Sequence, residues 1–273
     1  MLKFKLVILF TLIGVLEAAG QASEHCAAVA KLSAGNGLPA GSLVIVGGGL
    51  EQDNAHVFNR MIELAGGADN ATFAVIPSAS GVAVQSFVSF RNELISYGVK
   101  PGNIHLIKIA VVDDDSTTDA DESTWRDKGN NESYAEIIRK CSCVWFTGGD
   151  QLRTTKALYR ADGSCTPVLE AVWQVFLNGG VIGGTSAGAA IMSDPMIGAG
   201  NSIGALNHGV ISGVSGDDFD DNQGVLVARG LGFFPLGMVD QHFEARSRIG
   251  RFIITLLHYR DKVSLGFGID ENT

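Results

Sequence analysis

The segment Gly184-Thr185-Ser186-Ala187-Gly188 places a serine between two glycines, directly after a short apolar run. A serine hydroxyl attacks a carbonyl group only when it is exposed, oriented and next to a base. Flanking glycines allow the sharp strand-to-helix turn that holds a nucleophilic serine at the carboxyl edge of a sheet. The pattern also suits a glycine-rich turn in which the serine caps a helix. We predict that Ser186 is a nucleophile and keep the capping role as the alternative.

A second group of chemically active residues spans positions 240–251, after another apolar run. His242 could accept the serine proton, because histidine titrates near neutral pH. Among the other histidines, only His208, in a polar segment, is a credible rival. Arg246 and Arg248 cannot share one face of a regular helix, since two residues span about 200°. We expect one or both to point at the site and bind a carboxylate; a solvated helix face is the alternative.

A third candidate segment is the turn Gly148-Gly149, which follows the apolar run 144–147. Its backbone N–H groups, together with that of Ala187, could form an oxyanion hole, although the residues alone favour a simple strand-to-helix turn. Gly47-Gly48-Gly49 could bind phosphate, but it has neither the dinucleotide fingerprint nor the Walker pattern. Metal-ligand spacings of cysteine and histidine are also missing from the sequence. We therefore expect no cofactor and no metal.

Short apolar runs alternate with stretches of helical periodicity, as they do in α/β proteins. The expected strands are 42–46, 72–76, 104–109, 144–147, 181–182, 224–228, 238–243 and 264–269. The expected helices are 54–64, 82–97, 152–159, 168–177 and 246–259. Strands that are apolar throughout predict a mostly parallel sheet with helices on both faces. Residues 113–131 should form a surface loop, and residues 194–221 a long loop or β excursion.

The N-terminus indicates a secreted protein, and the net charge argues against one class of function. The net charge of −9 argues against nucleic-acid binding, which usually needs a basic surface. Lys3 and Lys5 precede an apolar run and then small residues, which is the order of a secretory signal. A membrane anchor would need ~20 apolar residues, and this run is shorter. We expect a signal peptide over 1–20, cleaved after Gly20, and a single α/β domain over 21–273 that is not membrane-bound.

The cysteines and the glycosylation sequons fit export but leave details open. An even number of cysteines permits two disulfides in an oxidising compartment, and free buried thiols are equally compatible. The cysteines are Cys26, Cys141, Cys143 and Cys165. Asn70 and Asn131 each begin an Asn-x-Ser/Thr sequon. A homodimer is also compatible with the sequence.

Taken together, these segments resemble the cyanophycinase family of serine peptidases, relatives of the aspartyl dipeptidases. The resemblance covers nearly all of the chain after the signal, and the serine turn combined with Asp-Gln-His-Phe-x-x-Arg-x-Arg-x-x-Arg is specific. The matching segments are 46–49, 146–151, 183–192, 240–251 and 268–271. The resemblance implies a flavodoxin-like core related to class I glutamine amidotransferases. It also implies hydrolysis of cyanophycin, multi-L-arginyl-poly-L-aspartate, to β-Asp-Arg dipeptides.

The resemblance further implies a role for individual residues. Ser186 would be the nucleophile, His242 the general base and Glu271 the acid that orients His242. Gly149 and Ala187 would donate their N–H groups to the oxyanion. The substrate pocket would contain Gln151, Asp240, Gln241, Arg246, Arg248 and Arg251. The role of Glu271 follows from the resemblance alone.

Three other functions fit the sequence. A secreted aspartyl or isoaspartyl dipeptidase would share the triad but have a smaller pocket. A non-catalytic binding protein on the same scaffold would keep the arginines without a working triad. An ordinary esterase would place its acid before the histidine, which here requires Asp217 or Asp220.

The chain departs from the family pattern in two ways. It ends two residues after Glu271, where we expect family members to continue with further strand and loop. Either the domain is truncated or its C-terminus is unusual, and Glu271 would be poorly anchored. The export signal suggests a substrate outside the cell, either polymer released by other cells or a different peptide.

Overall fold

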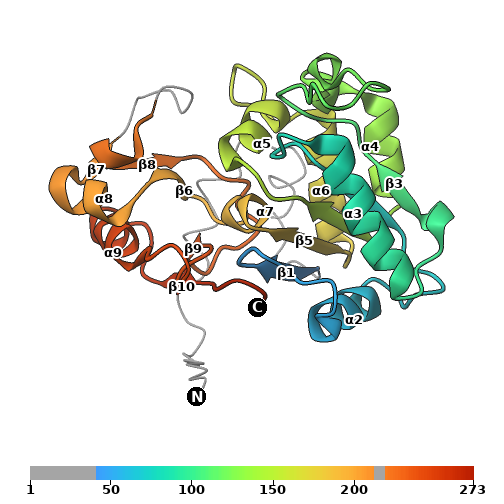
Figure 1. Cartoon of the computed structure of the whole chain (residues 1–273), viewed down its shortest axis with the longest axis horizontal. Helices are drawn as coiled ribbons and strands as arrows, with labels where there is room; N and C mark the ends of the chain where they lie inside the picture. Colours follow the sequence, from blue (N-terminus) through green and yellow to red (C-terminus); the bar gives the residue numbers. More distant parts are fainter. Residues whose placement is uncertain (1–40, 212–218) are drawn as a thin grey trace.

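The computed structural model describes residues 41–211 and 219–273 (Figure 1). The predicted signal peptide, Cys26 and Asp217 lie outside these residues. Within the two described ranges, no helix is both long and apolar enough to cross a membrane.

A five-stranded parallel sheet lies at the centre of the fold, in the order β1-β5-β4-β2-β3. Its strands are β1 (Ser42–Val46), β2 (Phe73–Ile76), β3 (Ile104–Leu106), β4 (Cys143–Phe146) and β5 (Val181–Thr185). The order β3-β2-β4-β5 is the 2-1-3-4 order of flavodoxin-like sheets, and β1 occupies the far edge. The expected α/β fold with a mostly parallel sheet is confirmed.

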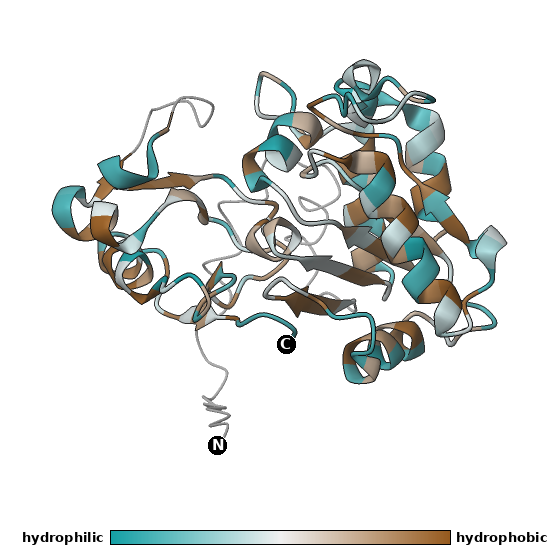
Figure 2. Ribbon diagram, in the orientation of Figure 1, coloured by the Kyte–Doolittle hydropathy of each residue, from teal (hydrophilic) through white to brown (hydrophobic). Residues whose placement is uncertain are grey.

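Helices cover both faces of this sheet, as predicted (Figure 1). Along β4, Trp145 packs with α2 and α3, whereas Phe146 packs with α4, α5 and α6 on the opposite face. Successive side chains of a strand point to opposite faces, so a strand buried on both sides is apolar throughout. Figure 2 shows this apolar character along β1. The helices are α2 (Ala55–Leu64), α3 (Ala83–Ser96), α4 (Glu132–Arg139), α5 (Gln151–Leu158) and α6 (Pro167–Leu177).

A second, smaller group of elements follows β5. It contains a three-stranded sheet in the order β6-β8-β7 and a parallel pair of β9 and β10. Ile197, Val225, Met238 and Phe252 form its apolar core. The strands are β6 (Met196–Gly200), β7 (Val210–Ile211), β8 (Val225–Ala228), β9 (Met238–Asp240) and β10 (Gly266–Gly268). The helices are α7 (Ala187–Ala190), α8 (Ser202–His208) and α9 (Ile249–His258).

Short 3₁₀ turns occupy several of the connections. They are η2 (Pro101–Asn103), η3 (Glu122–Trp125), η4 (Lys128–Asn130) and η6 (Asp221–Gln223). Both η3 and η4 fall in the segment expected to be a surface loop.

Two helices were not predicted from the sequence. Helix α4 directly follows the acidic segment and is only two turns long; the side chain of Asn131 caps it by accepting hydrogen bonds from Ser133 and Tyr134. Helix α8 lies in the segment expected to be a loop or β excursion, and the Asn201 side chain caps it. Both helices begin at an asparagine cap, which satisfies an otherwise free backbone N–H group.

The prediction that a helix begins at Arg246 was wrong, because α9 begins at Ile249. Ser247 has a φ of +50°, which is incompatible with a right-handed helix. The first free N–H groups of α9, those of Gly250 and Arg251, donate to the hydroxyl of Ser202 on α8. A cap from a residue so distant in sequence leaves no local signal for the start of the helix.

Cys141 and Cys143 are free and buried, whereas Cys165 is disulfide-bonded. The cysteines therefore form at most one disulfide, not two. Burial raises the pKa of the Cys141 thiol to about 12. These two thiols are neutral core groups rather than reactive ones.

Candidate active site

Ser186 sits at the turn between β5 and α7, with φ +55° and ψ −111°. Its backbone N–H donates to the carbonyl of Val46 at 3.0 Å. The flanking glycines are required by packing: a Cβ on Gly184 would lie 2.5 Å from the carbonyl oxygen of Gly188, and one on Gly188 would lie 2.4 Å from that of Phe146. The Ser186 side chain makes no capping bond to α7, so the capping alternative is wrong. The strained backbone presents the hydroxyl at the carboxyl edge of the sheet.

Ser186, His242 and Glu271 form one hydrogen-bonded chain. Nε2 of His242 lies 2.8 Å from Oγ of Ser186, and Nδ1 lies 2.5 Å from Oε1 of Glu271. With Nδ1 protonated toward the carboxylate, Nε2 is left to accept the serine proton. The structure thus brings together the three residues proposed for the triad. The catalytic roles themselves stay predictions.

The glycine turn after β1 forms the surface on which this pair rests. The carbonyl of Gly47 accepts a 2.6 Å hydrogen bond from the backbone N–H of His242. A Cβ on Gly48 would lie 2.1 Å from Cε1 of His242, and one on Gly49 would lie 3.3 Å from Cβ of Glu271. The absence of side chains therefore lets the imidazole and the carboxylate approach the backbone. The glycine run has a structural purpose in the site without any bound phosphate.

The surroundings of His242 keep its imidazole neutral. Burial lowers the pKa of His242 below its ordinary value, and the positive charges of Arg246 and Arg248 lower it further. The hydrogen bond to Glu271 opposes this shift, because it stabilises the charged imidazole. The result is a neutral base at neutral pH, as proton transfer from serine requires.

The turn Gly148-Gly149 lies beside the serine. A Cβ on Gly148 would lie 3.3 Å from Cβ of Ser186, and Gly149 has a φ of +135°. Within the described residues, the N–H groups of Gly149 and Ala187 donate to no protein acceptor. Both are therefore available to an oxyanion that develops next to the serine.

Asp240 and Arg251 are buried and paired with each other. Nε and Nη2 of Arg251 donate to the two carboxylate oxygens of Asp240, and Nη1 donates to the carbonyl of Gly200. Their exposures are 1% and 2%. This geometry occupies all the carboxylate oxygens and fixes α9 against β6 and β9. The two residues lie at the site, but their polar atoms face each other.

Arg248 and Arg246 carry positive charge that the pair does not compensate. Arg248 donates to the carbonyl of Gln241 at 2.8 Å and lies 3.5 Å from Asp240, which already pairs with Arg251. Its side chain is only 11% exposed. Burial and the charge of Arg251 lower its pKa to about 10, so it is still a cation at neutral pH. Arg246 is exposed and acts on the pKa of His242, which places its charge near the imidazole.

Two glutamines complete the set of predicted substrate residues. Nε2 of Gln151 donates to the carbonyls of Ile197 and Gly198. The amide nitrogen therefore links the start of α5 to β6. Gln241 is 3% exposed, and its Oε1 is buried without a hydrogen-bond partner among the described residues. A buried polar atom without a partner is costly, and a ligand donor would satisfy it.

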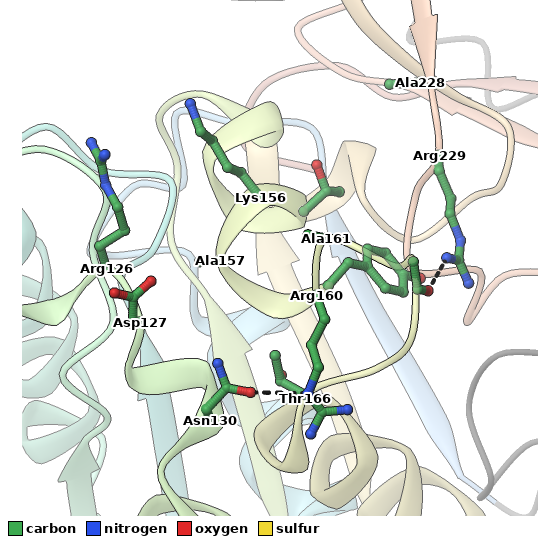
Figure 3. A pocket seen from close by; sticks show the side chains of 13 residues that line it. Arg126, Asp127, Asn130, Lys156, Ala157, Arg160, Ala161, Thr166, Ala228 and Arg229 are labelled. Carbon is green, nitrogen blue, oxygen red and sulfur yellow. Dashed lines mark hydrogen bonds between the residues drawn. The ribbon is translucent and has the colours of Figure 1, made fainter.

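A pocket of about 630 Å³ lies elsewhere on the protein and contains none of the predicted site residues (Figure 3). Its arginines are used internally: Arg160 donates to Asn130 and Ser164, and Arg229 donates to the carbonyl of Gly163. The pocket is therefore built from groups that hold surface loops. Among the described residues, no cluster of histidine, cysteine and carboxylate side chains could hold a metal ion.

Sequence reasoning missed one residue of the site, Asn272, and wrongly expected Glu271 to be poorly anchored. Asn272 has a φ of +57°, and its backbone N–H donates to the carbonyl of Gly48. The N–H of Gly47 donates to the carbonyl of Thr273. On the other side of Glu271, the N–H of Ile269 donates to the carbonyl of Asp240, so backbone hydrogen bonds fix the segment before and after Glu271. An asparagine directly after a catalytic acid is a signal for such a turn, because asparagine tolerates positive φ.

The fold is similar to that in the crystal structure of a peptidase from an acI-B1 actinobacterium. The TM-score is 0.54 at 21% sequence identity, and the match covers 85% of this chain and 80% of that one. At this identity the similarity concerns the fold alone. No protein-family model matches the sequence. The fold places the chain among α/β proteins with the architecture of this peptidase.

Curated cyanophycinases are similar over most of the chain. Identity is 34% to the protein of Geminocystis herdmanii, covering 85% of this chain and 72% of that protein. It is 31% to the protein of Synechococcus elongatus and 30% to that of Trichormus variabilis, covering 61% and 66% of their lengths. The chain thus spans between 61% and 72% of these relatives. The chain belongs to the cyanophycinase family.

Proposed function

We propose that the protein is a serine-type exopeptidase that hydrolyses cyanophycin to β-Asp-Arg dipeptides through an acyl-enzyme. The observation that carries this proposal is the continuous chain from Oγ of Ser186 through His242 to Glu271. The substrate is inferred from the curated relatives, which are cyanophycinases.

The reaction begins when Oγ of Ser186 attacks the scissile carbonyl carbon and passes its proton to Nε2 of His242. The N–H groups of Gly149 and Ala187 stabilise the oxyanion that forms. His242 then gives the proton to the leaving amine, and the C–N bond breaks to leave an acyl-enzyme. Water activated by His242 attacks the ester and releases Ser186. Glu271 orients the imidazole and stabilises its charged form during both steps.

The positive charge beside the triad supports a substrate that carries carboxylates. Asp240 is bound by both Arg251 and, at 3.5 Å, Arg248, so one carboxylate faces two guanidinium groups. With the exposed Arg246, the charge that acts on His242 is net positive. The α-carboxylates of the arginyl groups of cyanophycin are suitable partners, because a guanidinium binds a carboxylate with two parallel hydrogen bonds.

An aspartyl or isoaspartyl dipeptidase is the second candidate function. The pairing of Arg251 with Asp240 supports it, because Arg251 is then not free to bind a substrate carboxylate. A smaller substrate needs fewer carboxylate contacts.

Turnover of purified protein on cyanophycin and on Asp-X dipeptides separates the two functions. We expect release of β-Asp-Arg from the polymer, with a kcat/KM well above that for the dipeptides. Faster cleavage of the dipeptides, with no release from the polymer, would assign the dipeptidase instead. The matched control is the Ser186→Ala variant in each assay.

We also propose that the protein is exported. The lysines, apolar run and small residues of the N-terminus support this, as does the disulfide of Cys165. Expression with residues 1–20 in a bacterial host, followed by fractionation and N-terminal sequencing, tests it. A mature chain that begins at Gln21 outside the cytoplasm is expected, and an uncleaved cytoplasmic chain would contradict it.

A further inference from the structure

Asn272 joins the segment carrying Glu271 to the start of α2. Its Oδ1 accepts from the backbone N–H of Glu51 at 3.0 Å and from Nδ2 of Asn54 at 2.7 Å. Its Nδ2 donates to Oε2 of Glu51 at 3.0 Å, and its carbonyl accepts from Nδ2 of Asn54 at 2.9 Å. The Asn272 side chain thus makes three hydrogen bonds, all to residues more than 200 positions away in sequence.

Asn54 has a second bond that ties this network to a helix. Its Oδ1 accepts from the backbone N–H of Val57 and thereby caps α2, while its Nδ2 holds Asn272. Helix α2 packs on the central sheet through Phe58 and Met61, both fully buried. The network therefore connects the turn at Asn272 to a rigid part of the fold.

Glu271 needs such support, because packing does not hold its side chain. The carboxylate side chain is 45% exposed, whereas that of His242 is 8% exposed. It rests on the bare backbone of Gly49, which provides a surface but no polar contact. Its direction is set by the backbone of residues 270–273. Asn272 is the residue in that stretch whose side chain binds across to Glu51 and to Asn54, the cap of α2.

We propose that Asn272 is a positioning residue of the active site, which holds Glu271 in line with His242 by means of Asn54 and Glu51. The proposal rests on the proposed function for its kinetic consequences. Loss of the network would let the carboxylate move away from Nδ1. The imidazolium would then lose its partner, and proton transfer from Ser186 would slow.

Two variants remove bonds of this network, which joins Asn272 to Asn54 and Glu51, and leave the rest of the fold unchanged. Asn272→Gly keeps the positive φ and the backbone bonds but loses every side-chain bond. Asn54→Asp keeps the acceptor that caps α2 but loses both N–H donors to Asn272. Asn103→Gly is the matched control, because it removes a side-chain bond to the carbonyl of Ala71 at the other edge of the sheet.

The readouts are the pKa of His242, from NMR titration of its imidazole, and the kinetic constants on cyanophycin. Both network variants should lower the pKa of His242, because the bond to Glu271 raises it. They should lower kcat about 10- to 100-fold with little change in KM, as small misplacements of catalytic groups do. The control should change neither quantity, even if its midpoint of thermal unfolding falls.

An unchanged pKa of His242 and an unchanged kcat in both network variants would overturn the proposal. A change in Asn272→Gly without one in Asn54→Asp would overturn the part played by Asn54. The titration needs no substrate, so it tests the positioning role even if the wild-type protein leaves cyanophycin intact. That last result would contradict the proposed function alone.

Discussion

The imidazole of His242 lies directly on the backbone of Gly48, so closely that a Cβ on this glycine would come 2.1 Å from Cε1 and 2.4 Å from Nε2. The contact joins the turn after β1 to the residue that bonds both Ser186 and Glu271. The position of the His242 imidazole therefore depends on Gly48, a residue without a side chain.

Substitution of Gly48 by alanine should displace His242 and reduce kcat about 100-fold. Gly67→Ala is the matched control, since Gly67 also has a positive φ, +83°, but nothing lies within 4 Å of its Cβ. Both variants should be destabilised by about 1–3 kcal/mol through backbone strain. Comparison of urea unfolding with kcat separates the two effects. Equal activity in the two variants would show that the contact with His242 has no importance for catalysis.

The dependence of kcat/KM on pH should report His242, which acts as a base only when neutral. Burial and the neighbouring arginines lower its pKa below the ordinary value of 6.5, so the acid limb should lie below pH 6.5. Arg246→Gln removes one of the positive charges that lower this pKa, and the limb should move to higher pH. A limb that stays in place or moves to lower pH would exclude an effect of Arg246 on the base.

The buried pair of Asp240 and Arg251 should matter more for folding than the exposed Arg246. Asp240→Asn leaves Arg251, which is 2% exposed, without a counter-ion. The free energy of unfolding should fall by about 3–5 kcal/mol, as it does when one partner of a buried ion pair is removed. Arg246→Gln should change it by no more than about 0.5 kcal/mol. Urea unfolding of both variants checks the contrast, and similar stabilities would refute it.

The sheet could be predicted because the residues that define each strand lie next to one another in the sequence. Strands such as β4 are apolar throughout, and glycines or prolines mark where they end, so both the fold class and the place of Ser186 were predictable. The family resemblance was also confirmed, by curated relatives at 30–34% identity.

What the sequence could not reveal depends on distant partners. The start of α9 is set by Ser202, about 48 positions earlier, and Glu271 meets His242 across 29 positions. Composition does not show whether a charged side chain faces a ligand or another residue. Arg251 and Arg248 therefore look alike in the sequence, although the first is fully paired with Asp240 and the second is not.

The role of Ser186 as nucleophile is tested most directly by the rate of β-Asp-Arg release from cyanophycin by the wild-type protein and by Ser186→Ala, with folding checked by circular dichroism. The hydroxyl of Ser186 is the group that Nε2 of His242 can deprotonate, at 2.8 Å. We predict release by the wild type and a loss of about 10³-fold or more in the folded variant. Release by a folded Ser186→Ala variant at a rate close to that of the wild type would contradict it.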